Sequence, residues 1–181
     1  MKNFTLGILG LFCLMSCNPN NTKSKSSTIP ELEPLRSDIV VTPEYAILKF
    51  NSTVYWLFKN AKPASLNASE IKETELLLSK CINAYNPKQL KRFKKANKEN
   101  PGYKISKNHY IIDLVRYDRQ FIAVINKKDE KEVWVNCFCI TSSNKWKKEV
   151  FQVNDGENCF FNVKINLTKK TYYNLMVNGD A

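Results

Sequence analysis

The side chains best suited to chemistry in this chain are its cysteines and its one histidine, His109. A thiolate beside a histidine can act as a nucleophile, and thiols together with an imidazole can bind zinc. Two thiols can also form a disulfide in an oxidising compartment. The choice depends on where the chain folds and on which cysteines it keeps. The six cysteines are Cys13, Cys17, Cys81, Cys137, Cys139 and Cys159.

Residues 1–16 have the pattern of a secretory signal peptide. Lys2 supplies a positive start, and an apolar run from Phe4 to Leu14 follows it. This run is shorter than the roughly 20 apolar residues that a membrane-spanning helix needs. We therefore expect residues 1–16 to be removed on export.

The end of the apolar run, Leu14-Met15-Ser16-Cys17, resembles the lipobox of bacterial lipoproteins, at which signal peptidase II cleaves before an acylated cysteine. Met15 departs from that pattern, because a smaller residue is usual there. The resemblance implies that Cys17 carries a lipid that anchors the chain to a membrane of the cell envelope. Each buried methylene of such a lipid contributes roughly 0.8 kcal/mol. The alternative is an ordinary signal peptide with an incidental cysteine.

Residues 17–36 predict a flexible tether, because they are rich in Asn, Ser, Lys and Pro and contain little to bury. No acid directly follows Cys17, whereas lipoproteins displayed on the cell surface often carry an acidic signal there. The sequence therefore favours an outer membrane lipoprotein that faces the periplasm. Residues 37–181 are long enough for a single globular domain with a real core.

Once Cys13 is cleaved off and Cys17 is lipidated, four thiols remain for the folded domain, and they allow three complete disulfide connectivities. A disulfide that involves Cys159 and a set of buried free thiols are both open. A zinc site is disfavoured, because Cys137 and Cys139 lack the usual Cys-x2-Cys spacing. We expect no metal and no cofactor. The four thiols are Cys81, Cys137, Cys139 and Cys159.

Two N-terminal helices are predicted. Thr42 and Pro43 resemble the start of a helix over residues 43–59. Asn67 and Glu70 form a capping box for a second helix, which Pro87 is expected to stop. The basic run 88–99 is compatible with a short third helix.

From His109 onward the apolar period changes to that of strands, separated by polar turns such as residues 127–130. Short consecutive strands predict an antiparallel β-meander, and hence an α+β domain. Helices followed by such a meander resemble the cystatin-like and NTF2-like layouts, which host many functions. The expected strands are 109–116, 119–126, 131–140, 146–153, 159–166 and 171–177.

Three aromatic residues, Trp134, Phe138 and Phe160, alternate with the apolar residues that should face the helices. If the helices cover that other face, these aromatics form an exposed patch that can bind a protein or a glycan. The alternative is that loop 141–145 or the N-terminal helix covers them.

The C-terminal half also resembles small lipoproteins of Bacteroidetes. The resemblance spans roughly the last 70 residues and implies no catalytic residues. The segments that carry it are Ala123-Val124-Ile125-Asn126-Lys127-Lys128, Val133-Trp134-Val135-Asn136-Cys137-Phe138-Cys139, Asp155-Gly156-Glu157-Asn158-Cys159-Phe160-Phe161 and Lys164-Ile165-Asn166-Leu167 through Val177-Asn178-Gly179.

The formal net charge is +11, and the positive excess is concentrated between Pro87 and Asn108. An exported lipoprotein meets little nucleic acid, so we expect no nucleic-acid partner. The remaining readings are a solvated face, an anionic lipid or lipopolysaccharide surface, and an acidic protein partner. The candidate contacts with an anionic surface are Lys91, Arg92, Lys94, Lys95 and Lys98.

The sequence predicts a protein that is not an enzyme. It has no Gly-x-Ser-x-Gly nucleophile elbow, phosphate loop or dinucleotide fingerprint. We expect a membrane-anchored envelope lipoprotein with a binding or inhibitory role, whose partner is an envelope protein, a glycan or an anionic lipid. The alternative is a periplasmic hydrolase that uses His109 with a cysteine or a carboxylate.

Overall fold

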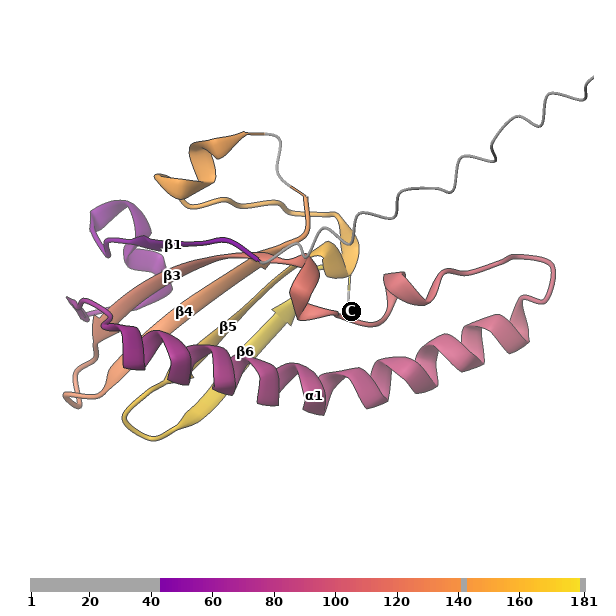
Figure 1. The fold of residues 1–181 in the computed structure, drawn as a ribbon, viewed down its shortest axis with the longest axis horizontal. Helices are drawn as coiled ribbons and strands as arrows, with labels where there is room; N and C mark the ends of the chain where they lie inside the picture. Colours follow the sequence, from indigo (N-terminus) through magenta and orange to yellow (C-terminus); the bar gives the residue numbers. More distant parts are fainter. Residues whose placement is uncertain (1–42, 141–142, 180–181) are drawn as a thin grey trace, which may run out of the picture. The chain divides into compact units, whose positions relative to one another are not determined.

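A mixed β-sheet carries the core of the protein. The computed structural model describes residues 43–140 and 143–179, and these belong to one compact unit. The strands lie side by side in the order β1-β3-β4-β5-β6, and β2 pairs with the end of β3 beyond β1 (Figure 1). The strands are β1 (Tyr45–Leu48), β2 (Lys62–Pro63), β3 (Asp118–Ile125), β4 (Lys131–Phe138), β5 (Phe160–Asn166) and β6 (Thr171–Val177).

The strands β3 to β6 are antiparallel neighbours, as the alternating sequence predicts, but β1 runs parallel to β3. A polar turn joins β3 to β4, where Asn126 Oδ1 accepts hydrogen bonds from the backbone N–H groups of Lys128 and Glu130. This turn confirms the one expected at residues 127–130. Because β1 comes from a segment that was expected to be helical, the sheet is mixed and the predicted all-antiparallel meander is wrong.

One long helix, α1 (Ala68–Glu99), covers one face of the sheet (Figure 1). The expected capping box is present: Glu70 N donates to Asn67 Oδ1, and Asn67 N donates to Glu70 Oε2, both at 2.9 Å. The first half of the helix buries an apolar stripe against the inward-facing residues of β3, β4 and β5. That stripe is made of Leu77, Leu78, Cys81 and Ile82.

Pro87 does not stop this helix, which corrects the expected boundary. Proline costs a helix one backbone hydrogen bond, and packing at this point opposes that cost. The side-chain amide of Asn86 donates to Ile112 O at 2.8 Å and accepts from Ile112 N at 3.0 Å. This contact holds the returning chain against the helix, so the expected third helix is the continuation of α1.

The predicted helix over residues 43–59 is also wrong. Its first part is strand β1, and Ser52–Leu57 form a 3₁₀ helix that begins at Asn51, whose side chain accepts from Thr53 N. The segment pairs its backbone with the open edge of β3, where Arg119 N donates to Glu44 O at 2.9 Å. An isolated helix of this length is marginal. The two predicted N-terminal helices are therefore replaced by one helix that follows a strand and a 3₁₀ turn.

Two expected strands are absent from the described residues. Residues 109–116 form 3₁₀ turns at Lys107–His109 and Leu114–Arg116. In place of the strand 146–153, a 3₁₀ turn at Asn144–Lys147 leads into an extended segment. The buried side chain of Gln120 supplies the hydrogen bonds that a strand partner would give: it donates to Trp146 O and Glu149 O and accepts from Phe151 N.

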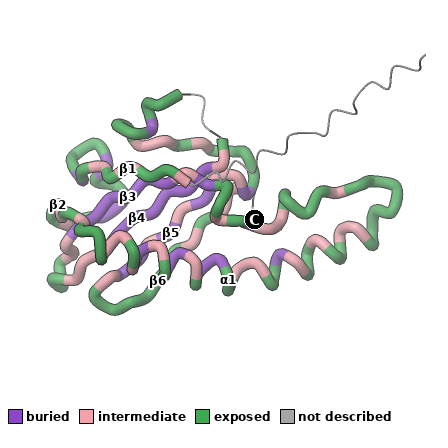
Figure 2. The backbone as a smooth tube through the Cα atoms, viewed as in Figure 1, coloured by how far each residue is buried: buried purple, intermediate pink, exposed green. Residues whose placement is uncertain are grey.

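The central strands β3 and β4 are therefore covered on both faces, as their buried residues in Figure 2 show, whereas most residues of β6 are exposed. On the face opposite α1, the segment 50–58 packs on Ile122, Val124 and Trp134. Residues 144–151 cover the neighbouring part of the same face. The strands of one sheet thus separate two apolar cores.

Candidate functional site

A helical arm extends beyond the part of α1 that lies on the sheet. The chain turns after Glu99 and runs back along the helix, so that residues 86–112 form a hairpin (Figure 1). At its base Asn86 holds Ile112, and further out the rings of Phe93 and Tyr110 pack with centroids 5.7 Å apart. We call residues 86–112 the basic arm.

The outward side of the basic arm carries the cations that the sequence singled out. Lys91, Lys95 and Lys98 are spaced by four and three residues, which places them on one face of the helix. Their only described ion pair is between Lys95 and Glu99, at 3.7 Å, and both side chains are mostly exposed. We call this set the basic face: Lys91, Arg92, Lys94, Lys95 and Lys98, all exposed.

A cleft of about 430 Å³ lies at the root of the arm, between α1, the returning segment and the end of β6. Among the described residues, its lining includes the basic side chains Arg92, Lys104 and His109 and the carboxylate of Glu157. Three tyrosines also line it: Tyr85, Tyr103 and Tyr110. Its volume lies within the range of small-molecule sites, but it is an open cleft lined by both polar and apolar surface.

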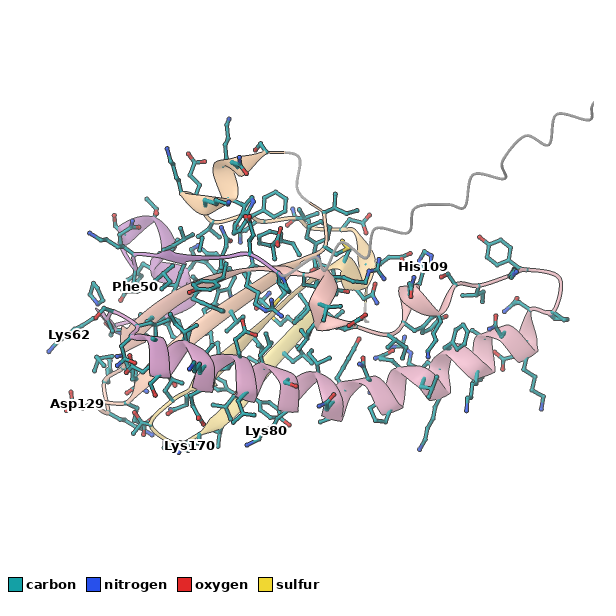
Figure 3. The ribbon with its side chains drawn as sticks, viewed as in Figure 1. Phe50, Lys62, Lys80, His109, Asp129 and Lys170 are labelled. Atoms are coloured by element: carbon teal, nitrogen blue, oxygen red, sulfur yellow. A yellow bond between two sulfur atoms is a disulfide. The ribbon has the colours of Figure 1, made fainter. Side chains whose placement is uncertain are left out.

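His109 and Glu157 lie within hydrogen-bond distance in this cleft, with His109 Nδ1 2.5 Å from Glu157 Oε2. The side chains are 56% and 60% exposed, so the pair is accessible to solvent and to a ligand. Figure 3 shows His109 on the returning segment, facing the body of the protein. The pairing joins two segments that are 48 residues apart in the sequence.

The wall of the cleft next to this pair is fixed by the buried Asn158. Its side-chain amide donates to Asn108 O at 2.8 Å. The backbone carbonyl oxygen of Asn158 accepts a hydrogen bond from the Tyr117 hydroxyl at 2.9 Å. These bonds tie the returning segment to the sheet, so His109 and Tyr110 are held on a supported loop.

The structure divides the four thiols into two pairs. Cys139 and Cys159 form a disulfide, and Cys81 and Cys137 are buried free thiols. Both readings that the sequence left open therefore apply, each to one pair. Burial raises the pKa of Cys81 to about 11 and also raises the pKa of Cys137. Neither thiol is a thiolate near neutral pH, and a thiolate is the nucleophilic form.

Metal binding finds no support in residues 43–140 and 143–179, where no three His, Cys, Asp or Glu side chains form a group that could hold an ion. His109 lies near Glu157. Cys159, two residues after Glu157, forms the disulfide with Cys139.

The predicted aromatic binding face is not exposed, which corrects that expectation. Trp134 is 3% exposed beneath Trp56 and the segment 50–58, and its ring meets the Trp56 ring at 6.2 Å. Phe138 is 1% exposed between Trp146 and Phe151. Phe160 is half-buried against Phe151. The structure agrees with the alternative, in which neighbouring segments cover these aromatic residues.

The cleft unites two residues that sequence analysis named, Arg92 and His109, with others that it did not connect. The sequence did not connect Tyr103, Lys104 and Glu157 with a common site, because the residues that line the cleft come from three separate stretches of the chain. Among the residues singled out beforehand, Lys94, Lys95 and Lys98 lie on the basic face outside the cleft lining.

Cys17 and the expected signal peptide and tether lie outside the described residues. Within residues 43–140 and 143–179, no helix combines the length and the apolar character that a membrane span requires. No family model matches the chain, and neither curated proteins nor solved structures yielded a significant match.

Proposed function

We propose that this chain is a lipoprotein of the bacterial cell envelope, anchored to the outer membrane through acylated Cys17, and that its folded part is a non-catalytic binding module that faces the periplasm. The lipobox-like residues support the anchor. The exposed basic face supports the binding role, and it is the observation that carries the proposal. Its expected partner is an anionic membrane surface.

The disulfide between Cys139 and Cys159 supports export. Disulfides persist in oxidising compartments such as the periplasm and are rare in the cytosol. This bond joins the residue after β4 to the residue before β5, so it closes the loop whose residues Trp146 and Phe151 cover Phe138.

The basic face is suited to an anionic lipid surface because its cations project from one side of a helix that stands clear of the sheet. Each lysine or arginine near an anionic membrane contributes about 1 kcal/mol. Inward residues of the same helix, such as Phe93, are occupied by packing against the returning segment. Lys91, Lys94 and Lys98 are exposed and can reach such a surface directly. Arg92 also contacts Gln89, and Lys95 pairs with Glu99.

The anchor is tested by growing cells that express the full chain with radiolabelled palmitate. We expect label in the wild-type chain, none in Cys17→Ala, and accumulation of the uncleaved chain when signal peptidase II is inhibited. Equal labelling of wild type and Cys17→Ala would contradict the anchor and would leave the basic face to be judged separately.

The basic face is tested with the full chain carrying Cys17→Ala, mixed with vesicles of phosphatidylglycerol or of phosphatidylcholine. Exchanging Lys91, Lys94, Lys95 and Lys98 for Gln should weaken binding to the anionic vesicles by more than about tenfold. The matched control exchanges Lys72, Lys80, Lys127 and Lys128, which are exposed elsewhere and carry the same total charge. An equal loss in both variants would contradict a role for this face.

A hydrolase is the second candidate, and the pairing of His109 with Glu157 inside the cleft favours it. A carboxylate bonded to Nδ1 can orient an imidazole as a general base. The buried thiols cannot be its nucleophile, so the reaction would use water or a hydroxyl. Turnover of p-nitrophenyl acetate or phosphate that is lost in His109→Gln and kept in Lys94→Gln would support this reading over the binding role.

A further inference from the structure

We propose that the outer edge of β1 binds an extended acidic peptide, which adds to the sheet as a further strand and places its apolar side chains in the groove beside that edge. This site lies apart from the basic face and from the cleft at the root of the arm, and it does not depend on the anchor at Cys17. The proposal rests on the unpaired edge of β1, on the groove and on the charges that line it.

Strand β1 forms one edge of the sheet, and among the described residues it pairs only with β3 (Figure 1). The backbone of Glu44 faces β3, because its N–H donates to Asp118 Oδ1 and its C=O accepts from Arg119 N, both at 2.9 Å. Successive residues of a strand direct their backbone groups to opposite sides, so those of Tyr45 and Ile47 point away from β3. A row of N–H and C=O groups of this kind is a template for another strand.

The other edge of the sheet, β6, is less suited to pairing. Its register against β5 shifts between Asn162 and Lys164, and Asn174 has a positive φ of 50°. A bulge bends an edge strand and interrupts its row of backbone groups. None of the residues of β1 has a positive φ, so β1 is the edge that offers an extended peptide a regular row.

A groove of about 630 Å³ lies beside the end of β1, between residues 47–56 and residues 147–152. Its apolar lining is continuous with the core on this face of the sheet, because Val54 belongs to that core and Leu48 and Val150 pack against it. Trp56 also lines the groove and is 53% exposed. When a peptide adds to a sheet edge, its main chain supplies affinity and pockets for alternate side chains supply specificity. The groove offers such apolar contacts next to the free edge.

Both walls of this groove are held by buried side chains of the sheet. On one wall, the buried Gln120 donates to Glu149 O at 2.6 Å and accepts from Phe151 N at 2.9 Å. On the other wall, the ring of Trp56 packs on the buried ring of Trp134, with centroids 6.2 Å apart. Walls that are already fixed reduce the conformational entropy that binding costs.

The charges of the groove favour an acidic peptide. Among the described residues, its lining carries Lys49, Lys147 and Lys148 and the carboxylate of Glu149. Lys147 pairs with Glu44 at 2.5 Å, whereas neither Lys49 nor Lys148 has an ion pair in the part of the chain that the structure describes. Two copies of this chain, each with a formal net charge of +11, repel each other. The occupant is therefore an acidic peptide segment and not a second copy.

The experiment is isothermal titration of the full chain carrying Cys17→Ala with a blocked hexapeptide of alternating glutamate and valine. Saturable binding with a dissociation constant below about 1 mM is the expected result. The comparison probes are the same peptide methylated on its backbone nitrogens, a lysine–valine peptide, a glutamate–serine peptide and dodecanoate. Each should bind at least about tenfold more weakly, because it lacks the strand donors, the negative charge, the apolar side chains or the peptide backbone.

Amide hydrogen exchange, measured by NMR, locates the peptide on one edge. Saturating glutamate–valine peptide should slow exchange of the Tyr45 and Ile47 N–H groups by more than about tenfold and leave the amides of β6 unchanged. Unchanged exchange at Tyr45 and Ile47, or protection of β6 in their place, would overturn the assignment to β1.

Three variants test the parts of the site. Trp56→Ala should weaken peptide binding by more than about tenfold, as for an aromatic anchor. Ile47→Pro removes an outward N–H at an edge position, where proline is tolerated, and should weaken binding by about three- to tenfold. Lys148→Gln, at an exposed position, should weaken it by about threefold. The matched controls Tyr103→Ala and Lys127→Gln lie outside the groove and should change the dissociation constant by less than about twofold.

Several results would overturn the proposal. Absence of saturable binding by the glutamate–valine peptide up to about 1 mM would remove the site. Equal binding of the methylated peptide would remove strand addition, and equal binding of the lysine–valine peptide would remove the role of charge. Tighter binding of dodecanoate would assign the groove to acyl chains. A dimer in sedimentation that dissociates in Ile47→Pro would assign the edge to a second copy. Equal losses in Lys127→Gln and Lys148→Gln would reduce the effect to net charge. None of these results bears on vesicle binding by the basic face.

Discussion

The first half of α1, residues 68–82, lies on the sheet, whereas the second half, residues 86–99, belongs to the basic arm. In the first half the buried apolar side chains are Leu77, Leu78, Cys81 and Ile82, beside one buried polar residue, Thr74. Charges of both signs lie on the other sides. In the second half the one fully buried side chain is polar, Gln89, and the charged residues are cations apart from Glu99. The first half of the helix is therefore held in place by buried side chains, and the second half presents positive charge to solvent.

This difference separates the residues of α1 that stabilise the fold from those that are available for binding. The first half is also fixed by ion pairs to the sheet, from Glu70 to Lys131 at 2.5 Å and from Glu75 to Arg119 at 3.1 Å. The arm is held by polar contacts instead: Asn86 bonds Ile112, and Asn158 and Glu157 bond the returning segment at Asn108 and His109. Substitutions in the first half should therefore change the free energy of unfolding, and those on the arm should mainly change ligand binding.

The largest effect is expected from Leu78→Ala, which removes a fully buried side chain from the first half of α1. A cavity of this kind lowers the free energy of unfolding by about 2–5 kcal/mol. Leu90→Ala in the arm, where the side chain is half-buried, should cost only about 1 kcal/mol. Urea denaturation of both variants measures the difference, and equal losses would break the contrast between the two halves.

Asn86→Ala should have the next largest effect, because it removes both side-chain bonds to the backbone of the buried Ile112. Two unsatisfied backbone groups predict a loss of about 1–3 kcal/mol. Asn86→Asp keeps the acceptor for Ile112 N and should lose less. Hydrogen exchange at residues 103–112 should rise in Asn86→Ala; unchanged exchange there would show that the arm is held by other contacts.

Acidification should weaken the first half of α1 and the hairpin beside it. Hydrogen bonds from Lys169, Asn126 and Asn166 lower the pKa of Glu130 to about 2, and Lys131 lowers the pKa of Glu70. A lowered carboxylate pKa stabilises the folded state fully above the unfolded value near about 4.3 and loses this contribution as the pH falls toward 2.

The expected result is a fall in the free energy of unfolding from about pH 5 to pH 2. The raised pKa of Glu75, caused by burial, acts in the opposite direction, but from its unfolded value of about 4.5 upward, because there the folded state binds the extra proton. In Glu130→Gln the curve should be flatter than in the wild type. Glu99→Gln, in the arm, is the control and should follow the wild-type curve.

The smallest effect is expected from Lys95→Gln, which breaks the exposed pair with Glu99. Pairs of this kind on a helix surface contribute about 0.3–0.5 kcal/mol, so the denaturation midpoint should hardly move. A loss as large as that of Leu90→Ala would show that charge, rather than the ring contacts, holds the arm together.

Local signals in the sequence were sufficient for part of this architecture. The capping box at Asn67 and Glu70 marked the start of α1, because both partners lie within one helical turn. The alternation in β4 and β5 identified the residues that face the helix, and the polar turn after Asn126 marked a hairpin. Each of these signals is complete within about ten residues, so no distant contact was needed to read it.

Other features depended on contacts between distant segments, and only the tertiary structure decided them. The bonds between Asn86 and Ile112 carry α1 through Pro87. Gln120 holds the segment that buries Phe138, and the open edge of β3 takes β1 in place of a helix. The cleft brings His109 to Glu157 across 48 residues. The position of each of these groups is set by packing of the whole sheet, which no local pattern of residues encodes.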